Sequence, residues 1–261
     1  MKAKRFKWSA LCPVFLLTLA VPALSQMPDR PSPSGFRLGL GFEYFSQTIS
    51  WNDLDTERTS EMTSALASLI LGYKAGPGFY LAAIVGYSSS NFDGLIFRHV
   101  PFSREIGSGG MSGALLGGEL SASIIRGRMI GLEAFGQALA YFGVARTSEL
   151  AGLAVSGDAE SKPSWMRVTA GPVIRFGRST GFRPYIYPNL RYLKGKYEFS
   201  ETIQNLKGQE KKDLTGQGQF GLSAGADMIL SEPLSLRAEA GLYPRSDGND
   251  FTVNIKMQFG F

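Results

Sequence analysis

The chain has 261 residues, of which 44% are hydrophobic and 12% aromatic, with 32 glycines and one cysteine. Its 27 lysines and arginines exceed its 22 acidic residues, but residues 1–25 hold four of the basic residues and no acid, which leaves 23 against 22. A chain so nearly balanced offers no basic patch for nucleic acid. The length is ample for one domain, and the many glycines and aromatics favour short strands over helices.

Residues 1–25 have the pattern of a secretory signal peptide. A basic start, made by Lys2, Lys4, Arg5 and Lys7, precedes an apolar run over residues 9–21 that is short for a spanning helix of about 20 residues. Small residues before Gln26 predict cleavage there and export by the Sec pathway. Cys12 would leave with this segment, so we expect no disulfide or thiol chemistry in the mature protein. Residues 26–35 form a short Pro/Ser leader before a domain over residues 36–261.

Beyond the leader, apolar and polar residues alternate in ten segments, and no run is long and apolar enough for a spanning helix. Alternation predicts strands with one apolar and one polar face. The ten expected strands cover about 36–50, 62–75, 78–92, 110–126, 128–146, 164–177, 181–199, 216–231, 233–244 and 251–261. Residues 172, 184 and 188 are prolines on the apolar face, where each removes a backbone donor, so a bulge, a seam or a shifted boundary must accommodate them.

The connections between these strands differ in length. Those after the even-numbered strands are tight, whereas residues 51–61, 93–109, 147–163, 200–215 and 245–250 make longer ones. Short turns at one end and longer loops at the other are typical of membrane β-barrels. Aromatic residues also gather near the strand ends of the apolar face, as at a membrane interface. We therefore favour a membrane barrel, apolar face outward, over a soluble barrel or sandwich that would bury that face.

In the last segment, residues 251–261, apolar and polar residues alternate at every position, and the segment ends on Phe261. It resembles the closing strand of bacterial outer-membrane β-barrels, and the mature chain resembles the family of small OmpA-like and OmpX-like barrels. The resemblance implies an all-β fold: one antiparallel up-and-down barrel of about ten strands (eight or twelve being alternatives), with short periplasmic turns and longer extracellular loops. It also implies a monomer in the Gram-negative outer membrane, in contact with lipid and lipopolysaccharide. The barrel-assembly machinery would read Phe259 and Phe261.

The polar faces of the predicted strands would line the lumen. They carry eight bases and five acids, namely Arg37, Glu43, Lys74, Glu119, Glu133, Arg167, Arg175, Arg183, Arg191, Asp227, Arg237, Glu239 and Lys256. Small barrels are largely filled by side chains, and buried charges must pair, which predicts a closed, cross-braced lumen. The alternative is a narrow anion-preferring pore, lined by an arginine ladder on the sixth and seventh strands.

Catalytic residues are sparse. His99 is the single histidine, and with Ser103 and Glu105 it offers a weak match to the Ser/His pairs of membrane lipid hydrolases. The ten-strand count resembles the omptin proteases, and Asp53 and Asp55 could mimic their Asp pair. Phe97, however, stands where those enzymes have an Asp two residues before the His. No His/Cys cluster can hold zinc, and we expect no metal, cofactor or enzyme activity.

The second long connection is unusually apolar for an exposed segment. Its candidate contact residues are Leu95, Ile96, Phe97, Arg98, His99 and Phe102. They predict either a contact site for an unknown surface ligand or a lid folded over the barrel mouth. By its resemblance, the chain would have a non-enzymatic role in envelope integrity, adhesion or surface contact through these loops.

Overall fold

The computed structural model describes residues 35–53, 56–75, 78–107, 109–127, 129–149, 157–177 and 181–261. The signal segment, the leader up to residue 34, Asp55 and the expected turns at 76–77 and 178–180 lie outside the described residues. Every regular element within the described ranges is a strand. None of these ranges forms a helix with the length and apolar character needed to span a bilayer.

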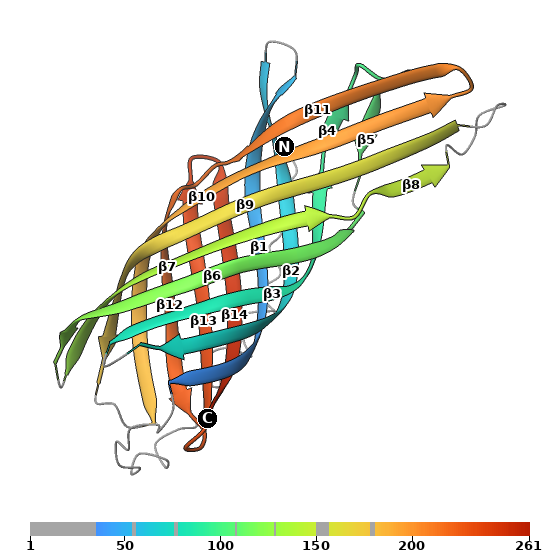
Figure 1. Ribbon diagram of the computed structural model, residues 1–261. Coiled ribbons are helices and arrows are strands. Elements are labelled where there is room, and N and C mark those ends of the chain that lie inside the picture. Colours follow the sequence, from blue (N-terminus) through green and yellow to red (C-terminus); the bar gives the residue numbers. More distant parts are fainter. Residues whose placement is uncertain are drawn as a thin grey trace, which may run out of the picture.

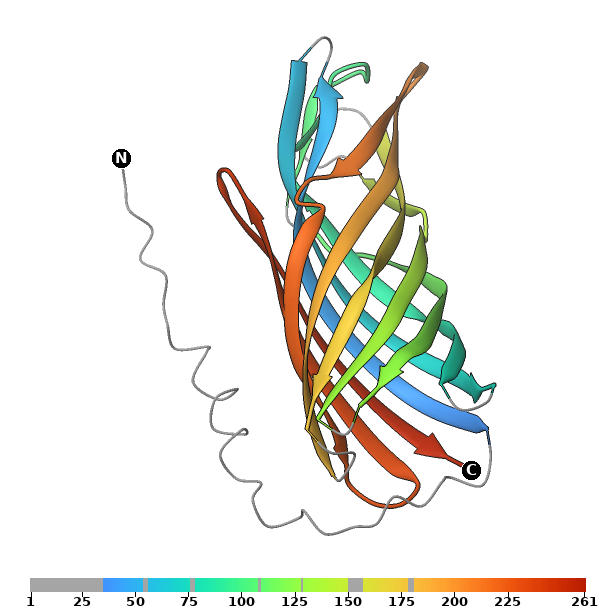
Figure 2. The same cartoon turned by 90° about the vertical axis from the view of Figure 1, so that its left-hand side faces the viewer.

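Ten of the described strands pair with their neighbours into a closed antiparallel ring (Figures 1 and 2). They are β1 (Phe36–Asp53), β2 (Thr56–Lys74), β3 (Phe79–Asp93), β6 (Met111–Arg126), β7 (Ile130–Gly143), β9 (Gly157–Phe176), β10 (Phe182–Ile203), β12 (Phe220–Ile229), β13 (Leu234–Arg245) and β14 (Gly248–Gly260). The alternating segment at the chain's end closes the ring, because β14 pairs with β1 from Arg37↔Gly260 to Ser46↔Phe251. The predicted ten-stranded barrel is confirmed.

The apolar face of the strands is the outer one. Phe36 and Phe42 are 64% and 58% exposed, whereas Arg167 and Arg191, on the inner face, are each 2% exposed. Outer aromatics pair near the strand ends, as Phe36 does with Tyr73 at 4.8 Å between ring centroids. A ring whose apolar face points outward needs lipid around it. In water, each exposed apolar side chain would cost about 25 cal/mol of transfer free energy per Å² of its apolar surface. This arrangement excludes the soluble barrel and sandwich.

The two ends of the barrel differ. We call the end that holds Phe36, Gly260 and the short turns the turn end, and the opposite end the hairpin end; they lie at the bottom and top of Figure 1. The five longer connections leave the barrel at the hairpin end, and most of their described residues are strand rather than open loop. Four more strands form there: β4 (Leu95–Phe97), β5 (Arg104–Ile106), β8 (Arg146–Glu149) and β11 (Leu206–Gly216). Residues outside the part of the barrel with an apolar outer face still form backbone hydrogen bonds between strands. Without that apolar face, the alternation in the sequence does not predict them as strand.

The prolines on the outer face interrupt one ladder without shifting its register. Between β9 and β10, the pairs Ile186↔Ile174 and Leu190↔Ala170 are kept and the rungs between them are missing. Unchanged register on both sides places Pro188 opposite Pro172, so the two absent N–H donors fall on one rung. Gly171 permits the strands to stay close there, since an added Cβ would lie 2.2 Å from the carbonyl oxygen of Pro188. Pro172 and Pro188 therefore form a local seam, with no bulge, whereas Pro184 lies outside this seam and pairs with Ala226 of β12.

Candidate functional site

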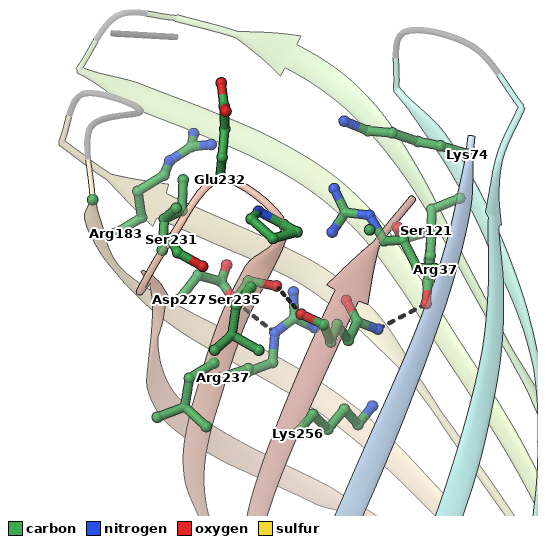
Figure 3. A pocket seen from close by; sticks show the side chains of 18 of the residues that line it. Arg37, Lys74, Ser121, Arg183, Asp227, Ser231, Glu232, Ser235, Arg237 and Lys256 are labelled. Carbon is green, nitrogen blue, oxygen red and sulfur yellow. Dashed lines mark hydrogen bonds and ion pairs between the residues drawn. The ribbon is translucent and has the colours of Figure 1, made fainter. Parts of the chain in front are cut away.

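The structure places all thirteen predicted lumen charges along the inner face of the barrel, with Lys74 exposed at the turn end of β2. Nine of them line a cavity of about 660 Å³ at the turn end, which we call the turn-end cavity (Figure 3). The other four, Glu43, Arg167, Arg191 and Glu239, line a much smaller cavity of about 30 Å³ further along the lumen. Each charge occupies the inner face because the strand alternation that turns apolar side chains to lipid turns its polar neighbours inward.

Three of the four acidic side chains that line the turn-end cavity are held in ion pairs. Arg175 on β9 binds Glu133 on β7 at 3.0 Å and also contacts Asp227 on β12. Asp227 binds Arg237, its register partner on β13, at 2.6 Å between Oδ1 and Nε. Lys256 on β14 contacts Glu119 on β6 directly. Arg175–Glu133 and Asp227–Arg237 join adjacent strands, whereas Lys256–Glu119 joins β14 to β6 across the ring and so braces the barrel through its lumen.

Above this cavity, the lumen is crossed by cations that pack on aromatic rings. Arg167 Nη1 lies 2.6 Å from Glu43 Oε1, and its guanidinium carbon is 4.5 Å from the centre of the Phe45 ring. The guanidinium carbon of Arg191 is 3.6 Å from the ring centre of Tyr243. The expected arginine ladder is thus present on β9 and β10. Arg167 is paired with Glu43 and Arg191 is covered by Tyr243, whereas Arg175 and Arg183 line the turn-end cavity.

The hairpin end is filled by an apolar and aromatic core. Phe45, Ile49, Tyr141, Leu95 and Phe97 are fully buried in it. Leu95 and Phe97 belong to the β4–β5 hairpin, residues 95–106, which we call the plug hairpin. Phe97 packs on Tyr197 and Phe199 of β10, at 5.5 and 5.0 Å between ring centroids. The second connection therefore folds inward over the mouth, as the lid hypothesis expects.

The remaining contact candidates of this connection differ in exposure. Ile96 is half-buried against the same core, whereas Arg98, His99 and Phe102 remain exposed. Leu95 and Phe97 therefore cannot belong to an exposed contact surface, and any contact there would rest on Arg98, His99 and Phe102.

Three carboxylates hold the plug hairpin to the barrel wall. Glu210 Oε2 accepts the backbone N–H of Arg98 at 2.6 Å and of His99 at 2.7 Å, and Glu201 Oε2 accepts that of Phe102 at 2.8 Å. Asp53 binds Arg98 at 3.2 Å. The approach is close, because a Cβ at Gly208 of β11 would lie 2.7 Å from the Cα of Val100. Charged hydrogen bonds thus hold the hairpin by its backbone and not by its apolar contacts alone.

Burial, hydrogen bonding and charge oppose one another at Glu210. Burial favours the neutral acid, but the hydrogen bond from Lys212 and the backbone N–H groups of His99 and Arg98 outweigh it, and the pKa of Glu210 lies below its ordinary value of 4.5. Lys212 Nζ lies 2.6 Å from Glu210 Oε1 and 4.8 Å from the ring centre of Trp51. Glu210 is therefore ionised at neutral pH and serves as an anchor.

The residues considered for omptin-like chemistry have structural partners. Asp53 binds Arg58 at 2.8 Å, in addition to Arg98, and lies 3.8 Å from Lys212. The side chain of His99 is 67% exposed, with Nδ1 3.7 Å from Glu210 Oε2. The carboxylate of Asp53 is thus neutralised by cations, and the carboxylate nearest to His99 holds backbone groups.

Sequence reasoning missed the core at the hairpin end and its anchors Glu201, Glu210 and Lys212. A signal was present in the first strand, where Phe45, Ile49 and Trp51 share the inward parity of Glu43. These side chains continue the inner face of the first strand toward the hairpin end. There most of the residues that point into the lumen are apolar or aromatic and no longer charged. The anchors had no such signal, since their partners are backbone groups of a distant connection.

Comparison with solved structures finds outer-membrane β-barrels. The outer membrane protease OmpT from Escherichia coli matches with a TM-score of 0.51 at 9% identity, over 91% of this chain and 100% of OmpT. The translocator domain of the autotransporter NalP from Neisseria meningitidis matches with a TM-score of 0.48 at 13% identity, over 97% of this chain and 98% of that domain. Ail, the attachment invasion locus protein of Yersinia pestis, matches with a TM-score of 0.34 at 11% identity, over 87% of this chain and 99% of Ail.

No protein-family model matches the sequence, and no curated protein matches it. The likeness to OmpT and the outward apolar face together define the class: the fold is that of an outer-membrane β-barrel.

Proposed function

We propose that this chain is a non-enzymatic outer-membrane protein of a Gram-negative bacterium, a closed barrel that serves envelope integrity or surface contact through its hairpin end. The observation that carries the proposal is the filling of the lumen. Beyond the turn-end cavity, the inward side chains of Phe45, Tyr141, Tyr197 and Phe97 are buried in one core. Below them the lumen is crossed by Arg167, paired with Glu43, and by Arg191, stacked on Tyr243. Ten strands enclose a space that side chains can fill, unlike the wide lumen of larger porins.

In this proposal the turn end faces the periplasm and the hairpin end faces outward, as in the small OmpA-like and OmpX-like barrels. Lys162, Lys194 and Lys196 are exposed on the outer face beyond the aromatic Tyr192. Cations at this level would meet lipopolysaccharide phosphates. Phe259 and Phe261, both exposed, would be read by the barrel-assembly machinery, and the protein would work as a monomer.

Conductance tests the closed lumen. The purified protein, with folding checked by its heat-dependent shift on a gel, is inserted into a planar lipid bilayer beside a porin as a positive control. We expect no discrete steps from this protein while the porin conducts. Reproducible steps would overturn the proposal.

The runner-up function is a narrow anion-preferring pore. It is favoured by the excess of cations that line the turn-end cavity, six against four acids. Steps that prefer anions, and that are lost in Arg175→Ala and Arg191→Ala, would establish it. A plug hairpin that leaves the mouth would be required, since Phe97 is fully buried.

A further inference from the structure

The turn-end cavity is a large polar space in which the acids facing inward are already bound to cations. Glu119, Glu133 and Asp227 each bind a cation of the cavity wall, as described above. Glu232, the fourth acid of the lining, is exposed in the turn between β12 and β13. A volume of about 660 Å³ is far more than one water needs and lies in the range of small-molecule pockets.

Three cations of the same wall are left over. Arg37, Lys74 and Arg183 form no ion pair within 4.0 Å with any carboxylate in the described part of the chain. Arg183 Nε is enclosed and has no hydrogen-bond partner among these residues. Cations that repel one another around a cavity favour the entry of anions.

The three cations lie on different sides of the cavity. Figure 3 shows Arg183 on one side and Arg37 with Lys74 on the other. Tyr80, the register partner of Lys74 on β3, accepts a hydrogen bond from Gln258 Nε2 at 2.8 Å, which leaves its own O–H to donate. The arrangement presents separated positive groups and a neutral donor, and it suits a ligand with at least two anionic groups.

We propose that the turn-end cavity binds a small polyanion, carrying phosphate or carboxylate groups, that enters from the turn end. Arg183 holds one anionic group, and Arg37 and Lys74 hold another. The ligand is either a free solute or the head group of a lipid with two phosphates, since the recognising chemistry is the same. Binding requires no passage through the barrel, so this site is compatible with a closed lumen and does not depend on the function of the hairpin end.

The three cations can be removed without breaking a brace. Because they form no described ion pair, their neutral variants keep every pair of the network, and relief of repulsion should leave the barrel at least as stable. A purely structural role for these residues predicts the opposite, a loss of stability. Stability and binding therefore separate the two interpretations.

The test is calorimetric titration of the protein isolated from outer membranes and held in uncharged detergent. The probes are pyrophosphate and citrate, with glucose as the uncharged control. We expect saturable binding of at least one anion, about tenfold weaker in Arg183→Gln and in Arg37→Gln, and abolished when Lys74→Gln is added to both. The matched control is Lys162→Gln, an exposed lysine at the hairpin end, which should bind as the parent protein does.

Absence of saturable binding by either anion would overturn the proposal, and so would equal binding by the triple variant and the Lys162→Gln control. Nanodiscs of phosphatidylcholine, with or without cardiolipin, distinguish the two sources of ligand. Competition by cardiolipin, seen in the parent protein and lost in the triple variant, assigns the site to a lipid head group. Pyrophosphate or citrate binding that is the same with and without cardiolipin assigns the site to a free solute.

Discussion

Arg175 binds two acids of the lumen, Glu133 and Asp227, which lie on two other strands. Its neighbour Arg183 lines the same cavity without such a partner. The pair therefore offers a comparison at the scale of one residue: the same side-chain type, in the same cavity, with and without carboxylates. The two arginines should therefore differ in how much each contributes to the free energy of unfolding.

We predict that Arg175→Ala lowers the free energy of unfolding by about 3 kcal/mol, because it leaves Glu133 without its cation and removes one of two from Asp227. Urea titration of the refolded barrel, followed by tryptophan fluorescence and by the gel shift, measures this change. Arg183→Ala is the matched control and should change the free energy little. Equal losses in the two variants would show that pairing does not set the stability of the lumen.

At the scale of elements, the plug hairpin is attached to the barrel by its backbone. The β10–β11 hairpin brings Glu210 to the amides of Arg98 and His99, and β10 brings Glu201 to that of Phe102. Apolar packing of Leu95 and Phe97 places the hairpin in the mouth, and the carboxylates fix its position. Protonation should therefore loosen the attachment before it unfolds the ring.

The sign of this pH effect follows from Glu210. Its pKa in the folded protein lies below the ordinary value, so its stabilisation is complete above the unfolded pKa and is lost as the pH falls through the folded one. We predict that hydrogen-exchange protection of the Arg98 and His99 amides declines below about pH 4. In Glu210→Gln, protection should be low at neutral pH already.

Glu198→Gln is the control for that experiment, because Glu198 pairs with Lys211 at 2.7 Å on the outer face of the same hairpin. It should leave both amides protected. Protection in Glu210→Gln as high as in the parent protein would show that the apolar contacts suffice to hold the plug hairpin.

At the scale of the whole molecule, β14 completes the barrel and ends in aromatics that do not stabilise its interior. Phe259 and Phe261 are exposed and pack on each other at 5.1 Å between ring centroids. Because they lie on the outer surface, we expect them to affect assembly of the barrel in the cell and not the stability of the finished fold.

We predict that Phe261→Ala lowers the amount of protein in the outer membrane severalfold in cells but leaves refolding in detergent unchanged. Phe251→Ala, at the other end of the same strand and also exposed, is the control and should affect neither. The amount is measured by immunoblot of outer-membrane fractions, and refolding by the gel shift. Equal loss in both variants would assign the effect to general surface hydrophobicity.

The sequence alone determined the ring of strands and the direction of its faces. The signal is local: a period of two, repeated ten times, fixes which side chains of Phe36 to Ser50 or of Phe251 to Phe261 share a face. Once ten strands close on themselves, the charged face must be the lumen. All thirteen charged lumen residues could therefore be predicted without knowledge of their partners.

The tertiary structure decided what those residues do. Arg175 and Arg183 look alike in sequence, and only the distances across the ring show that one is paired and the other is not. The plug hairpin follows the same rule, because Glu210 lies 112 positions from Arg98 and local patterns carry no information on such contacts. Strand faces follow from alternation between neighbours in the chain, whereas pairing, plugging and the open cavity follow from closure of the barrel in three dimensions.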